Sequence, residues 1–200
     1  MNSAVPLEAA FFAQPAKAVA RALLGTLLVS TSGDELTIGR IVEAEAYIGP
    51  HDPASHAAER IGRTARNATM YGPPGIAYVY RSYGIHRCLN VVTDAPGFPA
   101  AVLIRAIEPI AGVETMRRRR WPGRPPGPDT QIGSGPGRLT VALGITLAHD
   151  AHPLDRVPLL IAAGDHVGRG RFVSGPRIGI TRATDWPLRF YVKGNPHVSR

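Results

Sequence analysis

The sequence contains little cysteine and little lysine, and each shortage excludes a kind of chemistry. Cys88 is the only cysteine among the 200 residues, so the chain forms no internal disulfide and builds no zinc site from cysteines. Lysine occurs only at Lys17 and Lys193, which leaves few candidates for a mechanism that passes through a Schiff base. The chemistry is therefore expected to depend on other side chains.

Long apolar runs are also missing. No run approaches the length of about 18 residues that a transmembrane helix needs. The first residues, MNSAVPLEAAFF, lack a basic stretch followed by an apolar core, so no secretory signal is expected. These absences favour a cytoplasmic protein.

Motifs for phosphate loops and metal sites are absent or weak. The sequence has no loop of the Gly-Xaa-Xaa-Xaa-Xaa-Gly-Lys type. His149 and His152 lie near Asp150 and Asp155, but their spacing matches no ligand template, and a polar loop explains the cluster as well. We therefore expect no metal and no cofactor.

Charge of one sign is concentrated in half of the chain. The net charge is 23 − 15 = +8, and 21 of the 23 basic residues are arginine. Residues 1–100 carry 8 basic and 8 acidic residues, whereas residues 101–200 carry 15 and 7. Such an excess indicates a polyanionic partner, although a basic enzyme from an arginine-biased genome would show it too.

Length and composition predict one domain, residues 1–200, because 200 residues suffice for a single core. Glycine and proline together number 22 + 19 = 41, which predicts many turns between short strands. Helices are predicted at residues 15–25, 112–120 and 134–144, the last with Ser134 as N-cap. Strands are predicted within residues 26–49 with a turn at Gly33–Asp34, within 76–93 with a turn at 82–84, and at 101–109, 157–163, 177–181 and 188–194. This order predicts an α+β fold with a curved, largely antiparallel β-sheet, flanking helices and a protruding β-hairpin.

The strand through Arg40–Tyr47 places carboxylates in an unusual position. Alternation puts Ile41, Glu43, Glu45 and Tyr47 on one face, and the valine and alanines between them on the other, core-facing side. Carboxylates are poor strand formers. The face is therefore either a solvated surface or the floor of a cleft with a general base and a stacking ring.

The predicted hairpin is rich in tyrosine and arginine. Tyr78 and Tyr80 share one strand face, where core packing and a binding role are both open. Tyr83 lies at the turn between Arg81 and Arg87, where an exposed ring is costly unless something covers it. A ring at a hairpin turn can be inserted between DNA base steps, and arginine beside tyrosine fits nucleic acid better than a small neutral ligand.

Five stretches resemble, in sequence order, the alkyladenine (3-methyladenine) DNA glycosylase family, and the resemblance spans about Leu7 to Ser199. They are RIVEAEAYIGPHDPASH (40–56), RTARNATMYGPPGIAYVYRSYGIHRCLNVV (63–92), AVLIRAIEP (101–109), GSGPGRLTVALGI (133–145) and PLRFYVKGNPHVS (187–199). The resemblance implies an enzyme of base excision repair that flips alkylated or deaminated purines out of duplex DNA and hydrolyses the N-glycosidic bond. The implied substrates are 3-methyladenine, 7-methylguanine, hypoxanthine and ethenoadenine. A monomer at the nucleoid is implied as well.

The resemblance also implies roles for single residues. Glu45 matches the general base that activates a water, Arg105 matches the arginine that holds the water and the carboxylate, and the backbone carbonyl of Ile180 completes the water site. With water as nucleophile and no positioned lysine, the enzyme is expected to be monofunctional and to leave an abasic site. The residues that match the base pocket are Tyr47, His56, Tyr80 and Asn90.

Contacts with the duplex are implied for a further set of residues. Tyr83 matches the residue that intercalates into the gap left by the flipped base. The arginines expected to contact the DNA backbone are Arg66, Arg81 and Arg138. The run Arg117–Arg120 is either a further phosphate contact or a solvated helix end.

Two other classes of function remain open from the residues alone. The same aromatics and arginines suit a non-catalytic nucleic-acid-binding domain. A sugar or nucleoside hydrolase using Glu43 and Glu45 is less suited, because residues two apart on one strand face lie roughly 6–7 Å apart on the same side. A glycosidase pair must flank its bond from opposite sides.

Overall fold

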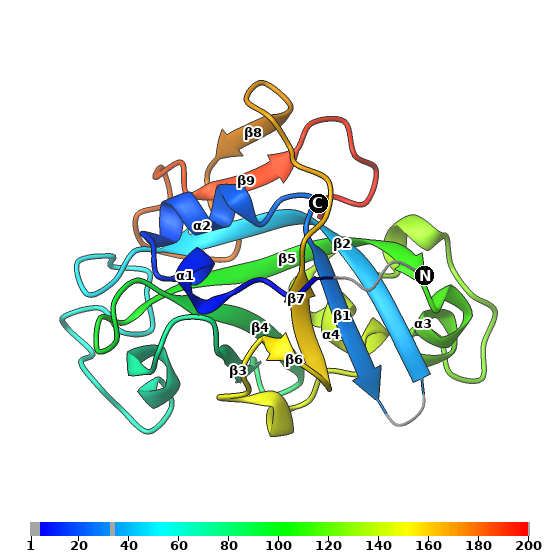
Figure 1. Ribbon diagram of the computed structural model, residues 1–200, viewed down its shortest axis with the longest axis horizontal. Helices are drawn as coiled ribbons and strands as arrows, with labels where there is room; N and C mark the ends of the chain where they lie inside the picture. Colours follow the sequence, from blue (N-terminus) through cyan, green and yellow to red (C-terminus); the bar gives the residue numbers. More distant parts are fainter. Residues whose placement is uncertain (1–4, 33–34, 200) are drawn as a thin grey trace.

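The computed structural model describes residues 5–32 and 35–199, which fold around one curved sheet (Figure 1). Its order is β3-β4-β5-β2-β1-β7-β6, β9 also pairs with β2, and β8 pairs with β9. All of these pairings are antiparallel. The strands are β1 (Leu27–Ser32), β2 (Glu35–Tyr47), β3 (Ala77–Ser82), β4 (His86–Thr93), β5 (Ala100–Ala111), β6 (Asp155–Arg156), β7 (Leu159–Ala162), β8 (Phe172–Gly175) and β9 (Arg189–Val192).

Strand β2 is central to the sheet because it is long enough to pair with three other strands, β1, β5 and β9. Its first half, residues 35–40, pairs with β1, and residues 43–45 pair with β9. Its other edge pairs with β5 from Ile38 to Tyr47. Glu43 and Glu45 therefore lie where β2, β5 and β9 meet.

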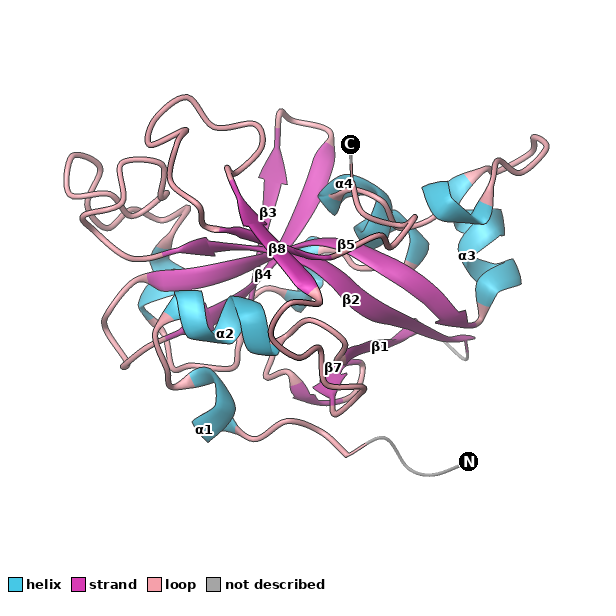
Figure 2. Ribbon diagram, turned by 90° about the horizontal axis from the view of Figure 1, so that it is seen from above, coloured by secondary structure: helices cyan, strands magenta, loops and turns pink. Residues whose placement is uncertain are grey.

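Short helices cover the sheet. They are α1 (Ala9–Phe12), α2 (Ala16–Ala22), α3 (Val113–Arg120) and α4 (Pro136–Ala142), with 3-10 turns at Ala68–Tyr71, Asp129–Gln131 and Leu147–His149. Helix α2 packs on β2 and β5, whereas α4 packs against α3, β4 and β5 (Figure 2). One apolar cluster includes residues from α2, α4 and the central strands. The predicted fold class, α+β with a largely antiparallel sheet, is confirmed.

The helix predicted at residues 15–25 is present as α2, which ends at Ala22, three residues before Gly25. Val19 and Leu23 share its buried face, with 1% and 0% of their surfaces exposed. Gly25 follows with φ +89°, and a Cβ there would lie 1.9 Å from the carbonyl oxygen of Asp165. Only glycine fits this turn without displacing that backbone.

The predicted hairpin strands and their turn are present as β3 and β4. Their register ends with Ser82 opposite His86. Tyr83 begins the turn in a left-handed conformation, φ 49°, and 85% of its surface is exposed. The structure therefore places a large aromatic ring in solvent at the turn.

One helix prediction and one strand prediction are wrong. Ser134 does not cap α4: Gly135 occupies the N-cap position and Pro136 begins the helix, while the Ser134 hydroxyl accepts from Arg138 at 3.1 Å. Proline needs no amide partner at the first helical position, so the N-cap and the start of the helix lie one residue later than predicted. The predicted strand at residues 177–181 is a loop, because the Ile178 amide donates to a carboxylate instead of a neighbouring strand.

The predicted alternation of side chains on β2 is wrong at Ile41. Ile41 belongs to the apolar core together with Ala44 and Ala46, not to the face of Glu43 and Glu45. The register with β5 shifts on both sides of Glu43, and an irregularity of this kind breaks the alternation of side chains.

Strand β8 was not predicted, and the predicted turn at Gly33–Asp34 lies outside the described residues. Among the helices of the described residues, none is both long and apolar enough to cross a membrane.

Candidate active site

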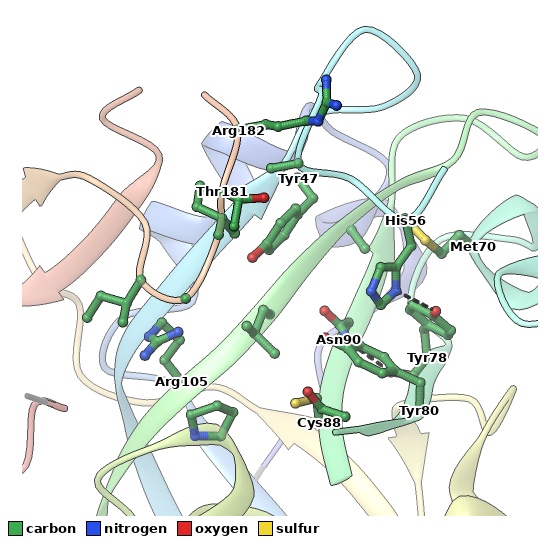
Figure 3. A pocket seen from close by; sticks show the side chains of 18 of the residues that line it. Tyr47, His56, Met70, Tyr78, Tyr80, Cys88, Asn90, Arg105, Thr181 and Arg182 are labelled. Atoms are coloured by element: carbon green, nitrogen blue, oxygen red, sulfur yellow. Dashed lines mark hydrogen bonds between the residues drawn. The ribbon is translucent and has the colours of Figure 1, made fainter. Parts of the chain in front are cut away.

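A cavity of about 610 Å³ opens where β2, β3, β4 and β5 meet two loops, residues 53–66 and 178–182. Its walls include all four residues expected in the base pocket, Tyr47, His56, Tyr80 and Asn90. Residues expected in other roles also line it, namely Arg66, Tyr83, Arg105 and Ile180. Figure 3 shows Tyr47 facing His56 and Tyr80 across the open space. The expected backbone contacts Arg81 and Arg138 do not line this cavity.

Glu45 lies directly behind this lining and has no exposed surface. Its Oε2 accepts from the Tyr47 hydroxyl at 3.1 Å, and its Oε1 accepts from the Ile178 amide at 2.8 Å. Arg105 Nη1 lies 3.3 Å from the same Oε1. Burial raises the pKa of Glu45 above its ordinary value, against the opposing effects of Arg105, the Ile178 amide and the Tyr47 hydroxyl. The site thus holds a carboxylate that protonates more readily than a free glutamate.

Glu43 accepts a hydrogen bond from Arg105, the arginine that also pairs with Glu45. Arg105 donates from Nε to Glu43 Oε1 at 3.1 Å, and Arg189 donates to the same oxygen at 2.6 Å. Ser199 donates twice, from its amide to Oε2 at 2.6 Å and from its hydroxyl to Oε1 at 2.9 Å. Since four donors occupy Glu43, it is not free to act as an acid or base. Arg189 and Ser199 lie more than 140 positions from Glu43, and local patterns in the sequence did not reveal them.

The aromatic side of the cavity is made by His56, Tyr78 and Tyr80. The His56 and Tyr80 rings lie 4.5 Å apart between centroids, and Tyr78 and Tyr80 lie 5.2 Å apart. His56 Nδ1 and the Tyr78 hydroxyl share a hydrogen bond of 2.9 Å. Burial, reinforced by Arg66, lowers the pKa of His56 to about 4, so the ring is neutral at pH 7 and carries one N–H.

Asn90 is held by the neighbouring strand of the hairpin. Its side-chain amide donates to the carbonyl of Tyr78 at 3.1 Å, and 4% of the residue is exposed. Cys88 lies two positions earlier on β4 and also lines the cavity. Burial raises the pKa of its thiol, so Cys88 is neutral and is not an activated nucleophile.

The three arginines expected at the DNA backbone, Arg66, Arg81 and Arg138, differ in their relation to the cavity. Arg66 lies over the Tyr80 ring at 5.3 Å and donates to the carbonyl of Arg81 at 3.0 Å. Arg81 and Arg138 are exposed. Arg66 is exposed as well, but it is the one of the three that lines the cavity.

The run Arg117–Arg120 is bound within the protein. Arg117 pairs with Glu114 and Asp129, and both Arg118 and Arg119 pair with Glu35. Arg120 donates to the carbonyl of Ile132 at 3.0 Å. Because each guanidinium already has a partner in the fold, the run contributes less to a free cationic surface than its sequence indicates.

Within the described residues, no group of three or more His, Cys, Asp or Glu side chains is placed to hold a metal. The site instead combines a buried carboxylate, an arginine and stacked rings. A family model for methylpurine-DNA glycosylase (MPG) matches residues 10–196. The chain belongs to the methylpurine-DNA glycosylase family.

Relatives from several organisms match nearly the whole chain. A protein of Rhodopseudomonas palustris (strain HaA2) is 52% identical over 197 residues, which cover 97% of this chain and 90% of the relative. A protein of Myxococcus xanthus is 48% identical and one of Methanoculleus marisnigri is 46% identical, again over 97% of this chain and over 93% and 98% of the relatives. All three are named "Putative 3-methyladenine DNA glycosylase".

Membership in the methylpurine-DNA glycosylase family confirms the resemblance and the enzyme class it implied. The chain is a DNA glycosylase, an N-glycosyl hydrolase of DNA repair that acts on alkylated purines. Its substrate is DNA, a polyanion, and a net charge of +8 is compatible with such a partner.

Proposed function

We propose that this family member flips alkylated and deaminated purines into the cavity and releases them with a water activated by Glu45. The observation that supports this most is a buried carboxylate, held by Arg105, the Ile178 amide and Tyr47, at the wall of an aromatic cavity of about 610 Å³. Such a volume lies within the range typical of small-ligand pockets, roughly 300–1,000 Å³. The proposed substrates are 3-methyladenine, 7-methylguanine, hypoxanthine and ethenoadenine.

In the proposed mechanism the flipped base stacks between Tyr47 and the pair His56 and Tyr80. Electron-rich rings attract a cationic alkylated purine, and Asn90 limits the space beside the purine edge. Glu45 accepts a proton from the attacking water as the bond from the sugar to the base breaks and its electrons pass to the base. A cationic alkylated purine leaves as a neutral base, whereas hypoxanthine and ethenoadenine must also take up a proton as they leave. The water would lie between Glu45, Arg105 and the carbonyl of Ile180. The lining that covers Glu45 must open to admit this water, as catalytic contacts often form only with substrate bound.

This assignment is tested with duplex DNA that carries a single lesion. After incubation and alkali, we expect strand cleavage at hypoxanthine, ethenoadenine or an alkylated purine, and no cleavage when the alkali step is omitted. Cleavage without alkali would contradict a monofunctional enzyme. Binding of lesion DNA with no alkali-sensitive product would favour a binding domain instead.

Replacing Tyr83 with Ser is expected to lower excision more than DNA binding. The ring is 85% exposed and is proposed to fill the gap left by the flipped base, where unstacking costs a few kcal/mol. The measurements are single-turnover excision of hypoxanthine and affinity for undamaged duplex. The control is Val157→Ser, which also removes an exposed apolar side chain (62% exposed) but lies outside the cavity. Equal losses in both measurements would make Tyr83 a structural residue.

As the pH is lowered, excision should be lost while the pH is still above 4.5, the ordinary pKa of a glutamate. Burial raises the pKa of Glu45, and the base works only when ionised, so lowering the pH removes activity early. The charged and titratable groups that face Glu45 are Arg105 and Tyr47, with Glu43 behind Arg105. The measurement is the single-turnover rate on 7-methylguanine DNA, because this base is already cationic and needs no further proton. A rate that stays level down to pH 4.5 in folded protein would contradict the prediction.

A further inference from the structure

The two loops that flank the cavity are tied together by one buried ion pair. Arg177 donates to Asp52 through both terminal nitrogens, at 2.5 and 2.9 Å, and neither side chain is exposed. Asp52 follows β2 and also accepts from the amides of Ile48 and Ala54. This orders the loop that leads to His56. Arg177 precedes the loop that carries Ile178.

Arg177 also contacts the residues that hold Glu45. Its guanidinium carbon lies 4.7 Å from the centroid of the Tyr47 ring, and Nη1 donates to the carbonyl of Ala46 at 3.0 Å. Tyr47, which Figure 3 shows at the cavity, donates to one oxygen of Glu45, and Ile178, the neighbour of Arg177, donates to the other. Arg177 thus lies against Tyr47, one of the two hydrogen-bond donors to Glu45, and is the sequence neighbour of Ile178, the other donor.

We infer that Arg177 is a positioning residue, which fixes the Tyr47 ring and the Ile178 amide so that Glu45 and the stacking wall keep their working geometry. The inference rests on the proposed function. A buried ion pair adds little net stability compared with apolar residues, so stability alone does not account for it. The planar guanidinium can stack on a ring and donate to a carbonyl and a carboxylate at once, which the lysine ammonium cannot do.

The test compares Arg177→Met, Arg177→Lys and the double variant Asp52→Asn with Arg177→Met. The double variant removes both charges, so no carboxylate remains buried without a partner, and Arg177→Lys keeps the charge and its pairing with Asp52. The matched control is Arg156→Met, since Arg156 also pairs with an aspartate, Asp155, but on the exposed surface. The readouts are single-turnover excision, affinity for undamaged duplex, and the Tyr47 ring signal in protein labelled with ¹³C-tyrosine, assigned with Tyr47→Phe.

All three Arg177 variants are expected to lose at least about tenfold in excision rate, as small displacements in a site cost this much or more. Their affinity for undamaged duplex should match that of Arg156→Met, and the Tyr47 signal should shift only when Arg177 is replaced. If the Arg177→Lys variant or the double variant is folded and its excision rate lies within about twofold of the wild-type rate, the inference is overturned.

Failure of the proposed function is distinguishable from failure of this inference. If the wild-type protein excises none of the lesions, the proposed function is wrong, and the Tyr47 signal alone decides the role of Arg177. A shift in Arg177→Lys that is absent in Arg156→Met supports positioning. An unchanged signal overturns it.

Discussion

Replacing Glu45 with Gln is expected to abolish excision and to leave lesion binding intact. Glutamine keeps the shape of the side chain but cannot take a proton from water, and loss of a general base costs about 10²–10⁴ in rate. Tyr47, His56 and Tyr80, which are proposed to stack on the base, are unchanged, so the lesion duplex should still bind. The measurements are single-turnover excision of 7-methylguanine and affinity for the same duplex.

The same substitution should not destabilise the protein. Because burial raises the pKa of Glu45, the fold favours its neutral form, and keeping it ionised at pH 7 costs stability. Glutamine imitates the neutral form, so the melting temperature at pH 7 is expected to be no lower than that of the wild type. Unchanged excision would show that Glu45 is not the base. Lost excision with a clearly lower melting temperature would indicate that the loss comes from unfolding.

Replacing Glu43 with Gln is expected to cost stability as well as activity. Glu43 is fully buried and is the carboxylate that Arg105 and Arg189 share, and their side chains are only 8% and 15% exposed. Breaking a buried ion pair by removing one partner costs about 3–5 kcal/mol. Arg105 would also lose the contact that holds it beside Glu45, so the excision rate of the folded fraction should fall as well.

The control for both glutamate substitutions is Glu108→Gln. Glu108 lies on β5 and pairs with Arg40 at 3.5 Å, with both side chains about a third exposed. A partly exposed pair of this kind is worth roughly 0–1 kcal/mol, and it lies outside the cavity. The free energy of unfolding comes from urea titration at pH 7. Equal losses for Glu43→Gln and Glu108→Gln would show that the Glu43 network is not a buried anchor.

Local patterns were sufficient for most of the elements. The helix before Gly25, the hairpin around Tyr83 and the long strand with two carboxylates are each determined by alternation, proline and glycine over a few residues. The missed loop at residues 177–181 shows how a distant group outweighs the local pattern. Residues 177–181 alternate like a strand, but the Ile178 amide donates to Glu45, 133 positions away.

The sequence by itself determined which side chains are available: a basic chain with one cysteine, two lysines, a carboxylate pair on a strand and a hairpin of tyrosines. Only the tertiary structure decided which of these side chains lie at the cavity and which are held by other groups. Glu43 and Glu45 are equivalent by strand period, yet Arg189 and Ser199 occupy the first, whereas Tyr47 and the Ile178 amide hold the second beside the cavity. The reason is physical: pairing of β9 with β2 brings Arg189 to Glu43, while Ser199 and Ile178 come from loops far along the chain, and contacts between distant segments leave no local period in the sequence.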